Sequence, residues 1–254
     1  MQSKHINSDI KKWIDKLPKT AFINKSNKYY VDNSILNPLP LVPYNETQWK
    51  KLFNLPPKSD YSKLQMTAIG TYSIGQPDIN KDLIRFIMEC IKDVNLDLNT
   101  LTITETNGGL GGFSSALLQN FNNLNIVELN PTHYEIIQNN LEVYGYGDDP
   151  TKKIIIFEQD YLNKMLELSQ DIIIADLPWG GPNYINQSSI RLGFSNIDLA
   201  AVINFLLSHN KFKLFIFLAP IDYNFNMFLS QIKTNNIYIT KVRHHNFVCI
   251  YGNK

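Results

Sequence analysis

The chain has 254 residues, of which 44% are hydrophobic and 19% charged, as is typical of a globular protein with a full core. No run approaches the roughly 18 apolar residues of a membrane-spanning helix, and the amino terminus lacks the apolar stretch of a signal peptide. Two cysteines are too few for a disulfide framework or a zinc site. We therefore expect an intracellular protein, cytoplasmic or nuclear, with no membrane partner, no metal and no disulfide.

The net charge of +1 conceals an asymmetry along the chain. Residues 1–64 contain eleven lysines, no arginine and five acids, a net charge of +6, so the remaining residues carry −5. Lysines in an amino-terminal lobe would suit phosphate contacts, although an ordinary solvated surface explains them equally well. The total charge is too small for a protein that coats long nucleic acid.

Residues 1–70 show a less regular pattern of predicted helices and strands than the rest of the chain. One helix is predicted near Ser8–Leu17, and the closely spaced prolines of "NPLPLVPY" and "LPPKSDY" prevent long regular elements. We expect a small accessory or substrate-binding lobe over residues 1–70 and a larger domain over residues 71–254.

Helices and strands alternate from about residue 77. Helices are predicted after Pro77, after a glycine-rich turn to about Phe121, from Pro131 to Gly145, and over Ile197–Ser208. Strands are predicted at Leu101–Glu105, "LNIVEL", "KKIIIFEQD", "QDIIIADLP" and "KLFIFLA", with two more around a tight polar turn at His244–Asn246. This order predicts an α/β fold with a mostly parallel, doubly wound sheet and an antiparallel edge hairpin.

Ligands of such sheets lie beyond the carboxyl ends of the strands, and the first such end is "TITETNGGLGGFS". Glu105 closes the strand, and Asn107, Gly109 and Gly111 follow in a loop whose glycines allow the backbone to approach a ligand. The Gly-x-Gly pattern is weak, because Ser114 stands where a dinucleotide fingerprint has glycine. A purely structural turn is the alternative.

Acids also close the next two strands. Glu128 is placed to accept the hydroxyls of a ribose, or alternatively to sit near the positive end of the helix that begins at Pro131. Asp160 could accept the amino group of an adenine. Together with the glycine loop these acids predict an adenosine-type cofactor, and no phosphate-binding P-loop sequence occurs.

The stretch "DLPWGGPNY", residues 176–184, follows the fourth strand. Asp/Asn/Ser-Pro-Pro-aromatic at this place marks methyltransferases that act on exocyclic amines of bases. More narrowly, Pro178-Trp179-Gly180-Gly181-Pro182-x-Tyr184 resembles the trimethylguanosine synthase family, which dimethylates N2 of the 7-methylguanosine RNA cap. The segments "ETNGGLGGFS", "ELNPTHYEIIQNNLEVYG", "QDYL", "FLAPIDYN" and "TYSIGQP" extend the resemblance over roughly residues 71–254.

The resemblance implies a class I, Rossmann-like methyltransferase domain over residues 71–254, with a seven-stranded sheet, S-adenosylmethionine as cofactor and capped RNA as partner. The implied cofactor-binding residues are Ser73, Glu105, Asn107, Gly109, Gly111, Glu128, Leu129, Asp160 and Asp176. The implied substrate-binding residues are Trp179, Asn183, Tyr184, Lys25 and Lys28, and the implied catalytic residues are Asp176, Pro178 and Trp179.

The chemistry agrees with these roles. An aryl amine is a poor nucleophile, so acceptors such as Asp176 and the carbonyls of the Leu177–Pro178 turn favour attack by orienting its N–H bonds. The indole of Trp179 suits a flat, positively charged 7-methylguanine, whereas the alternative is a tryptophan of the core. Lys25 and Lys28 would meet the triphosphate bridge.

One position departs from the family pattern, because Leu177 replaces the first proline and removes its fixed φ, while Pro178 still favours an extended Leu177. Three alternatives remain open: a methyltransferase for another nucleobase amine (adenine N6 or guanine N2 in ribosomal RNA), a catalytically inactive cap-binding module, and a plain structural domain. The structural domain is the weakest of them, because it would have no reason to place acids at successive strand ends. The sequence predicts no oligomeric state.

Overall fold

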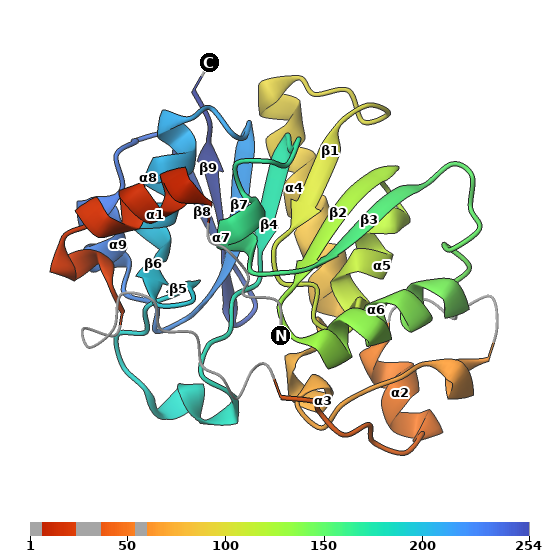
Figure 1. Ribbon diagram of the computed structural model, residues 1–254. Helices are drawn as coiled ribbons and strands as arrows, with labels where there is room; N and C mark the ends of the chain where they lie inside the picture. The colour runs from red at the N-terminus through yellow and green to blue at the C-terminus, as the bar shows by residue number, and fades with distance from the viewer. Residues whose placement is uncertain (1–6, 24–36, 54–59, 254) are drawn as a thin grey trace.

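The computed structural model describes residues 7–23, 37–53 and 60–253, apart from the side chain of Asn183. At the centre of this part of the chain is a seven-stranded sheet in the order β3-β2-β1-β4-β7-β9-β8 (Figure 1). The strands are β1 (Thr102–Glu105), β2 (Asn123–Glu128), β3 (Lys153–Glu158), β4 (Ile172–Ala175), β7 (Leu214–Pro220), β8 (Ile237–Val242) and β9 (His245–Tyr251). A separate two-stranded ribbon pairs β5 (Gly193–Phe194) with β6 (Ile197–Asp198).

The predicted sheet is confirmed. Strands β3, β2, β1, β4 and β7 run parallel, and β9 pairs antiparallel with both β7 and β8. The α-helices are α1 (Ser8–Lys16), α2 (Glu46–Leu52), α3 (Gly70–Ser73), α4 (Pro77–Val94), α5 (Gly112–Leu118), α6 (Pro131–Val143), α7 (Tyr161–Lys164), α8 (Leu199–Ser208) and α9 (Phe225–Gln231). Short 3-10 helices include η1 (Lys19–Ala21), η3 (Tyr61–Lys63) and η4 (Pro182–Asn186).

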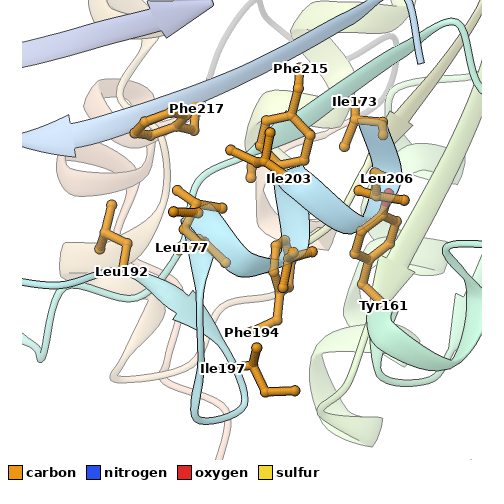
Figure 2. Close-up of a cluster of buried hydrophobic side chains, with 14 of the residues drawn as sticks. Tyr161, Ile173, Leu177, Leu192, Phe194, Ile197, Ile203, Leu206, Phe215 and Phe217 are labelled. Carbon is orange, nitrogen blue, oxygen red and sulfur yellow. The ribbon is translucent and has the colours of Figure 1, made fainter. Parts of the chain in front are cut away.

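Successive side chains of each strand point to opposite faces of the sheet, so the core has two layers, one on each face. In β4, Ile173 and Ala175 join one cluster, while Ile172 and Ile174 join the other. Helices α1, α7, α8 and α9 supply the first cluster, part of which Figure 2 shows, and helices α4, α5 and α6 supply the second. All four residues of β4 are buried, as expected of a central parallel strand covered on both faces.

The described residues of the predicted amino-terminal lobe pack in two different places. Ile10, Ile14 and Phe22 belong to the first core cluster, and Figure 1 shows α1 lying beside α8. Trp49 and Phe53, by contrast, join a third cluster that also contains residues of α6. The division of the chain at residue 70 remains a prediction.

The sequence placed the carboxyl-terminal turn too late. Val242 pairs with His245, so the turn consists of Arg243 and His244, whereas the prediction at His244–Asn246 was wrong. Arg243 has a φ of 58°, the positive value that short hairpins require. Asn246 instead continues β9, where its side-chain amide donates to the carbonyl of Pro220, and polarity alone did not reveal this bond.

Several elements of the structure were not predicted, among them α2, α9 and the β5–β6 ribbon. The helix α2 lies in the proline-rich region and is capped by the preceding Asn45, whose side chain accepts a hydrogen bond from the Gln48 N–H. The helix α9 and the β5–β6 ribbon lie in segments for which the sequence predicted loops. In the described ranges no helix is long and apolar enough to cross a membrane, no acid, histidine or cysteine cluster could hold a metal ion, and Cys90 and Cys249 are free, buried thiols.

Candidate active site

Four acids lie at the carboxyl ends of four neighbouring strands. Glu105 ends β1, Glu128 ends β2, Asp160 follows β3, and Asp176 follows β4. Because the strands are parallel and adjacent in the order β3-β2-β1-β4, their carboxyl ends share one edge of the sheet. The fold therefore brings these predicted residues to one side of the molecule.

The glycine loop between β1 and α5 combines a structural turn with an open position. A Cβ on Gly108 would come within 2.5 Å of Ile126, so this glycine is needed for close packing. Gly109 has a φ of 56°, and a Cβ there would meet no atom within 4 Å. Gly111, with a φ of 78°, is the residue immediately before α5. The open side of Gly109 is where a ligand can approach the backbone.

Glu128 is held by backbone donors. Its two carboxylate oxygens accept from the N–H groups of Gly109 at 2.8 Å and Asn130 at 2.7 Å. Asn130 in turn caps α6, so Glu128 lies near the positive end of that helix, as one reading of the sequence had it. Burial raises the pKa of its carboxyl, and the backbone bonds oppose that effect. A carboxylate can accept more hydrogen bonds than these, so ribose binding is compatible with them.

Glu105 is buried and faces the serine that replaced the expected glycine. The hydroxyl of Ser114 donates to its carboxyl at 2.5 Å. Burial raises the pKa of Glu105 to about 8, with smaller contributions from the charges of Asp176 and Glu128, although the Ser114 bond works against it. Burial therefore favours the protonated form of Glu105.

The remaining predicted cofactor residues flank this loop. Asn107 is half-buried and accepts from the hydroxyl of Thr106, and Leu129 is half-buried next to Glu128. Ser73 is exposed at the end of α3. A Cβ on Gly112 would lie 2.5 Å from Ile74, so the chain just after Ser73 packs directly on the glycine loop.

Asp160 is engaged through both oxygens. One accepts from the N–H of Leu162 at 2.9 Å, at the start of α7. The other accepts from the hydroxyl of Ser195 at 2.6 Å. Ser195 comes from the β5–β6 turn, which the sequence read as a loop, and a polar residue in a loop gave no signal of this contact.

Asp176 is the fourth of these acids and directly follows β4. The residue is half-buried, and no residue of the described ranges donates a hydrogen bond to its carboxylate oxygens. Burial raises its pKa to about 7. A carboxyl of this kind can accept the N–H bonds of a ligand and can exchange a proton at neutral pH.

Trp179 lies at the rim of both core layers. Its indole is half-buried and contacts the rings of Tyr184 at a centroid distance of 5.0 Å and His245 at 5.3 Å. The indole N–H is buried without a hydrogen-bond partner among the described residues. His245 was missed because the sequence pattern assigned this residue to the predicted hairpin turn. Trp179 thus belongs to an aromatic group of three rings at the carboxyl end of β4.

The other predicted substrate residues divide between this group and segments that are not described. Pro178 is exposed, and Tyr184 is half-buried within η4. The side chain of Asn183, and Lys25 and Lys28 entirely, lie outside the described residues. Gly181 has a φ of 75°, and a Cβ there would meet no atom within 4 Å, so the turn after Trp179 is open like the loop at Gly109.

Leu177, the departure from the family pattern, faces away from this opening. Its side chain is 2% exposed and belongs to the first core cluster. Figure 2 shows it among the buried side chains that include Leu192 and Phe217. The leucine therefore fills core volume, and Pro178 alone restrains the backbone between Asp176 and Trp179.

Comparison with known proteins agrees with this geometry. Residues 101–247, more than half of the chain, match the model of a family described as RNA cap guanine-N2 methyltransferase. An uncharacterized protein of Acanthamoeba polyphaga mimivirus is 30% identical over 151 residues, which cover 58% of this chain and 57% of the relative's length.

One solved structure shares the fold at low identity. The amino-terminal domain of human METTL16 has a TM-score of 0.50 and 12% identity, and the match covers 80% of this chain and 76% of that one. A human methyltransferase 10 domain-containing protein has a TM-score of 0.49 and 9% identity, with 81% and 91% covered. The family match, with the acids and glycines in their expected strand order, leads to one conclusion. The chain belongs to the RNA cap guanine-N2 methyltransferase family of class I, S-adenosylmethionine-dependent methyltransferases.

Proposed function

We propose that this methyltransferase methylates the exocyclic N2 of a 7-methylguanosine RNA cap. One observation carries the proposal. A carboxylate without a described donor and a half-buried indole, Asp176 and Trp179, lie three residues apart at the carboxyl end of the central strand β4. The carboxylate can accept the N–H groups of an amine, and the indole face can stack on a flat cation.

The cofactor half of the site would be formed by the strand ends on the other side of Asp176. Glu128 would accept from the ribose hydroxyls, and Asp160 from the adenine amino group, while Gly109 leaves room for the approach. Ser73, Glu105, Asn107, Gly111 and Leu129 would complete this half. When bound, S-adenosylmethionine supplies an electrophilic methyl group on a sulfonium.

Asp176 would orient the guanine amine. Its carboxylate accepts an N–H of the amine, and the backbone carbonyls of the Leu177–Pro178 turn can accept the other, so that the nitrogen faces the methyl group. The amine loses one proton when its nitrogen gains a methyl group. A carboxyl with a pKa of about 7 can take that proton near neutral pH.

Trp179 would distinguish the cap from ordinary guanine. A positively charged 7-methylguanine on an indole face gains about 0.5–2 kcal/mol over an uncharged base. Tyr184 contacts the same indole, and it would help to fix the orientation of Trp179. Asn183 is proposed to contact the base, and Lys25 and Lys28 are proposed to contact the triphosphate bridge.

The test is a methylation assay on a cap dinucleotide. We expect that incubation of 7-methylguanosine cap analogue with enzyme and S-adenosylmethionine gives a product with one or two added methyl groups, which fragmentation mass spectrometry locates on N2. Calorimetry with the cofactor runs alongside. Cofactor binding without any cap product would contradict the proposal.

A second function, methylation of another nucleobase amine, is favoured by Leu177. With only Pro178 to restrain the turn, the amine site is less rigid than one with two prolines. An uncapped oligonucleotide methylated in preference to the cap analogue would support this alternative.

A further inference from the structure

Ser195 makes a contact that links two distant parts of the fold. It lies between β5 and β6, and its hydroxyl donates to Asp160 at 2.6 Å across 35 residues of sequence. The backbone of Ser195 has a φ of 54°. This left-handed region is uncommon for residues other than glycine, and it directs the serine side chain at Asp160.

The carboxylate of Asp160 is fixed from two sides. The N–H of Leu162 holds one oxygen at 2.9 Å, and Ser195 holds the other. Loss of the Ser195 hydroxyl would remove one restraint on rotation of the carboxylate about its terminal bond, because such sp³–sp² torsions are broad. A carboxylate can accept more than two hydrogen bonds, so these two bonds are compatible with a ligand.

The β5–β6 turn is itself anchored to the amino-terminal segment. The N–H of Ile23 donates to the carbonyl of Asn196 at 2.8 Å. Arg191 forms an ion pair with Asp198 of β6 at 2.8 Å and donates to the carbonyls of Thr20 and Phe22. Ser195 is therefore held on a rigid ribbon, and this anchoring gives its hydroxyl a fixed direction.

We propose that Ser195 is a positioning residue for the cofactor, which fixes the Asp160 carboxylate so that it accepts the adenine amino group and rejects purines without one. This inference rests on the proposed role of Asp160. It assigns to residues of the β5–β6 turn a part in selecting the nucleoside of the cofactor.

The test compares two ligands by calorimetry: S-adenosylhomocysteine, and its analogue with unsubstituted purine in place of adenine. We expect the unmodified enzyme to bind S-adenosylhomocysteine about tenfold more tightly, since a hydrogen bond to a carboxylate is lost in the analogue. Ser195→Ala should remove most of this preference by weakening S-adenosylhomocysteine alone.

Two further variants separate positioning from a general disturbance. Ser195→Gly keeps the left-handed backbone without strain and should lose the preference as Ser195→Ala does. Ser189→Ala is the matched control, because Ser189 also has a positive φ, 63°, and its hydroxyl accepts from Asn224 at 2.6 Å. This control should keep the preference.

Three results would overturn the inference: an unmodified enzyme that binds both ligands equally, a Ser195→Ala variant that weakens both equally or neither, or a Ser195→Gly variant with full preference. None of these measurements involves RNA. Their failure is therefore distinguishable from failure of the proposed cap methylation, which the product assay reports.

Discussion

At the scale of single residues, the chemistry of the site depends on how burial changes the pKa values of its carboxyl groups. Four carboxyl groups meet at one edge of the sheet, and burial raises the pKa of at least three of them, Glu105, Glu128 and Asp176. Glu105 has a hydroxyl donor and Glu128 has backbone donors, whereas the described residues offer none to Asp176. Of these three, Asp176 is the one to which no described residue donates a hydrogen bond, so it has the most acceptor capacity for a ligand.

The pH dependence of catalysis should therefore follow Asp176. As an acceptor of the amine proton it must be ionised, and its raised pKa of about 7 means that the ionised fraction increases as pH rises from about 6 to 8. We expect kcat/KM to rise over this interval, because kcat/KM reports the pKa values of the free enzyme. Asp176→Asn should remove the rise and lower kcat by about 10²-fold.

The control for this experiment lies at the other end of the same strand. Asp171 precedes β4, and its carboxylate accepts from the N–H of Thr102. Asp171→Asn keeps an acceptor there and should retain the pH profile. A pH-independent unmodified enzyme would contradict the role of Asp176.

Trp179 should govern preference for the charged base. Trp179→Ala should weaken binding of 7-methylguanosine cap analogue by about 2- to 30-fold, since the cation–π contribution is lost. Binding of the unmethylated analogue and of S-adenosylhomocysteine should change much less.

The matched control is Trp13, another half-buried tryptophan, whose ring stacks on Phe205 at 4.2 Å. Trp13→Ala should reduce stability and leave cap preference intact. If Trp179→Ala weakened cap and cofactor together, Trp179 would be a structural residue of the core.

At the scale of elements, two turns have the same backbone feature in different halves of the site. Gly109 follows β1 and Gly181 follows β4, and both have positive φ with open space where a Cβ would lie. Alanine at either position strains the backbone similarly, at a cost of about 1 kcal/mol. Any difference between the two variants then reports what occupies each opening.

We expect Gly109→Ala to weaken cofactor binding by at least about tenfold, because its methyl group occupies the space that the ligand needs. Gly181→Ala should instead raise KM for the cap and leave cofactor binding unchanged. Calorimetry with S-adenosylhomocysteine and steady-state kinetics give the two readings. Equal effects of both variants on cofactor binding would mean that backbone strain alone was measured.

The same scale shows what the sequence could predict. Long apolar runs such as that of β4 identified the strands, and Pro131 correctly marked the start of α6. The β5–β6 ribbon was missed because each of its strands has two residues, too few to show the alternation of apolar and polar side chains that identifies a strand. Its contacts with Asp160 and with residues 20–23 depend on tertiary packing, so Ser195 carried no local signal.

His245 illustrates a related limit. The sequence grouped it with the polar turn, but pairing with Val242 places it in β9 beside Trp179. A shift of one residue in the register of a hairpin moves each side chain of the strand to the other face of the sheet. The candidate residues at strand ends were therefore predictable from position, and those brought in by hairpin register were not.

At the scale of the whole molecule, the described amino-terminal segments are integrated with the sheet. Ile10, Ile14 and Phe22 pack in the same cluster as α8, and Gln65 and Asn140 are joined by two hydrogen bonds. Asn140 also donates to the carbonyl of Leu110 in the glycine loop. Residues before 70 thus support the predicted cofactor loop through Asn140, a relation that composition alone did not indicate.

The central claim is that the whole molecule selects a methylated cap and methylates its amine. The most direct measurement is a competition in one reaction among 7-methylguanosine cap analogue, its unmethylated counterpart and an uncapped guanine-containing oligonucleotide, with products quantified by mass spectrometry. We predict methylation at N2 of the 7-methylguanosine analogue, with a kcat/KM about tenfold above that for either competitor. Equal use of the two analogues, or preference for the uncapped oligonucleotide, would contradict the account.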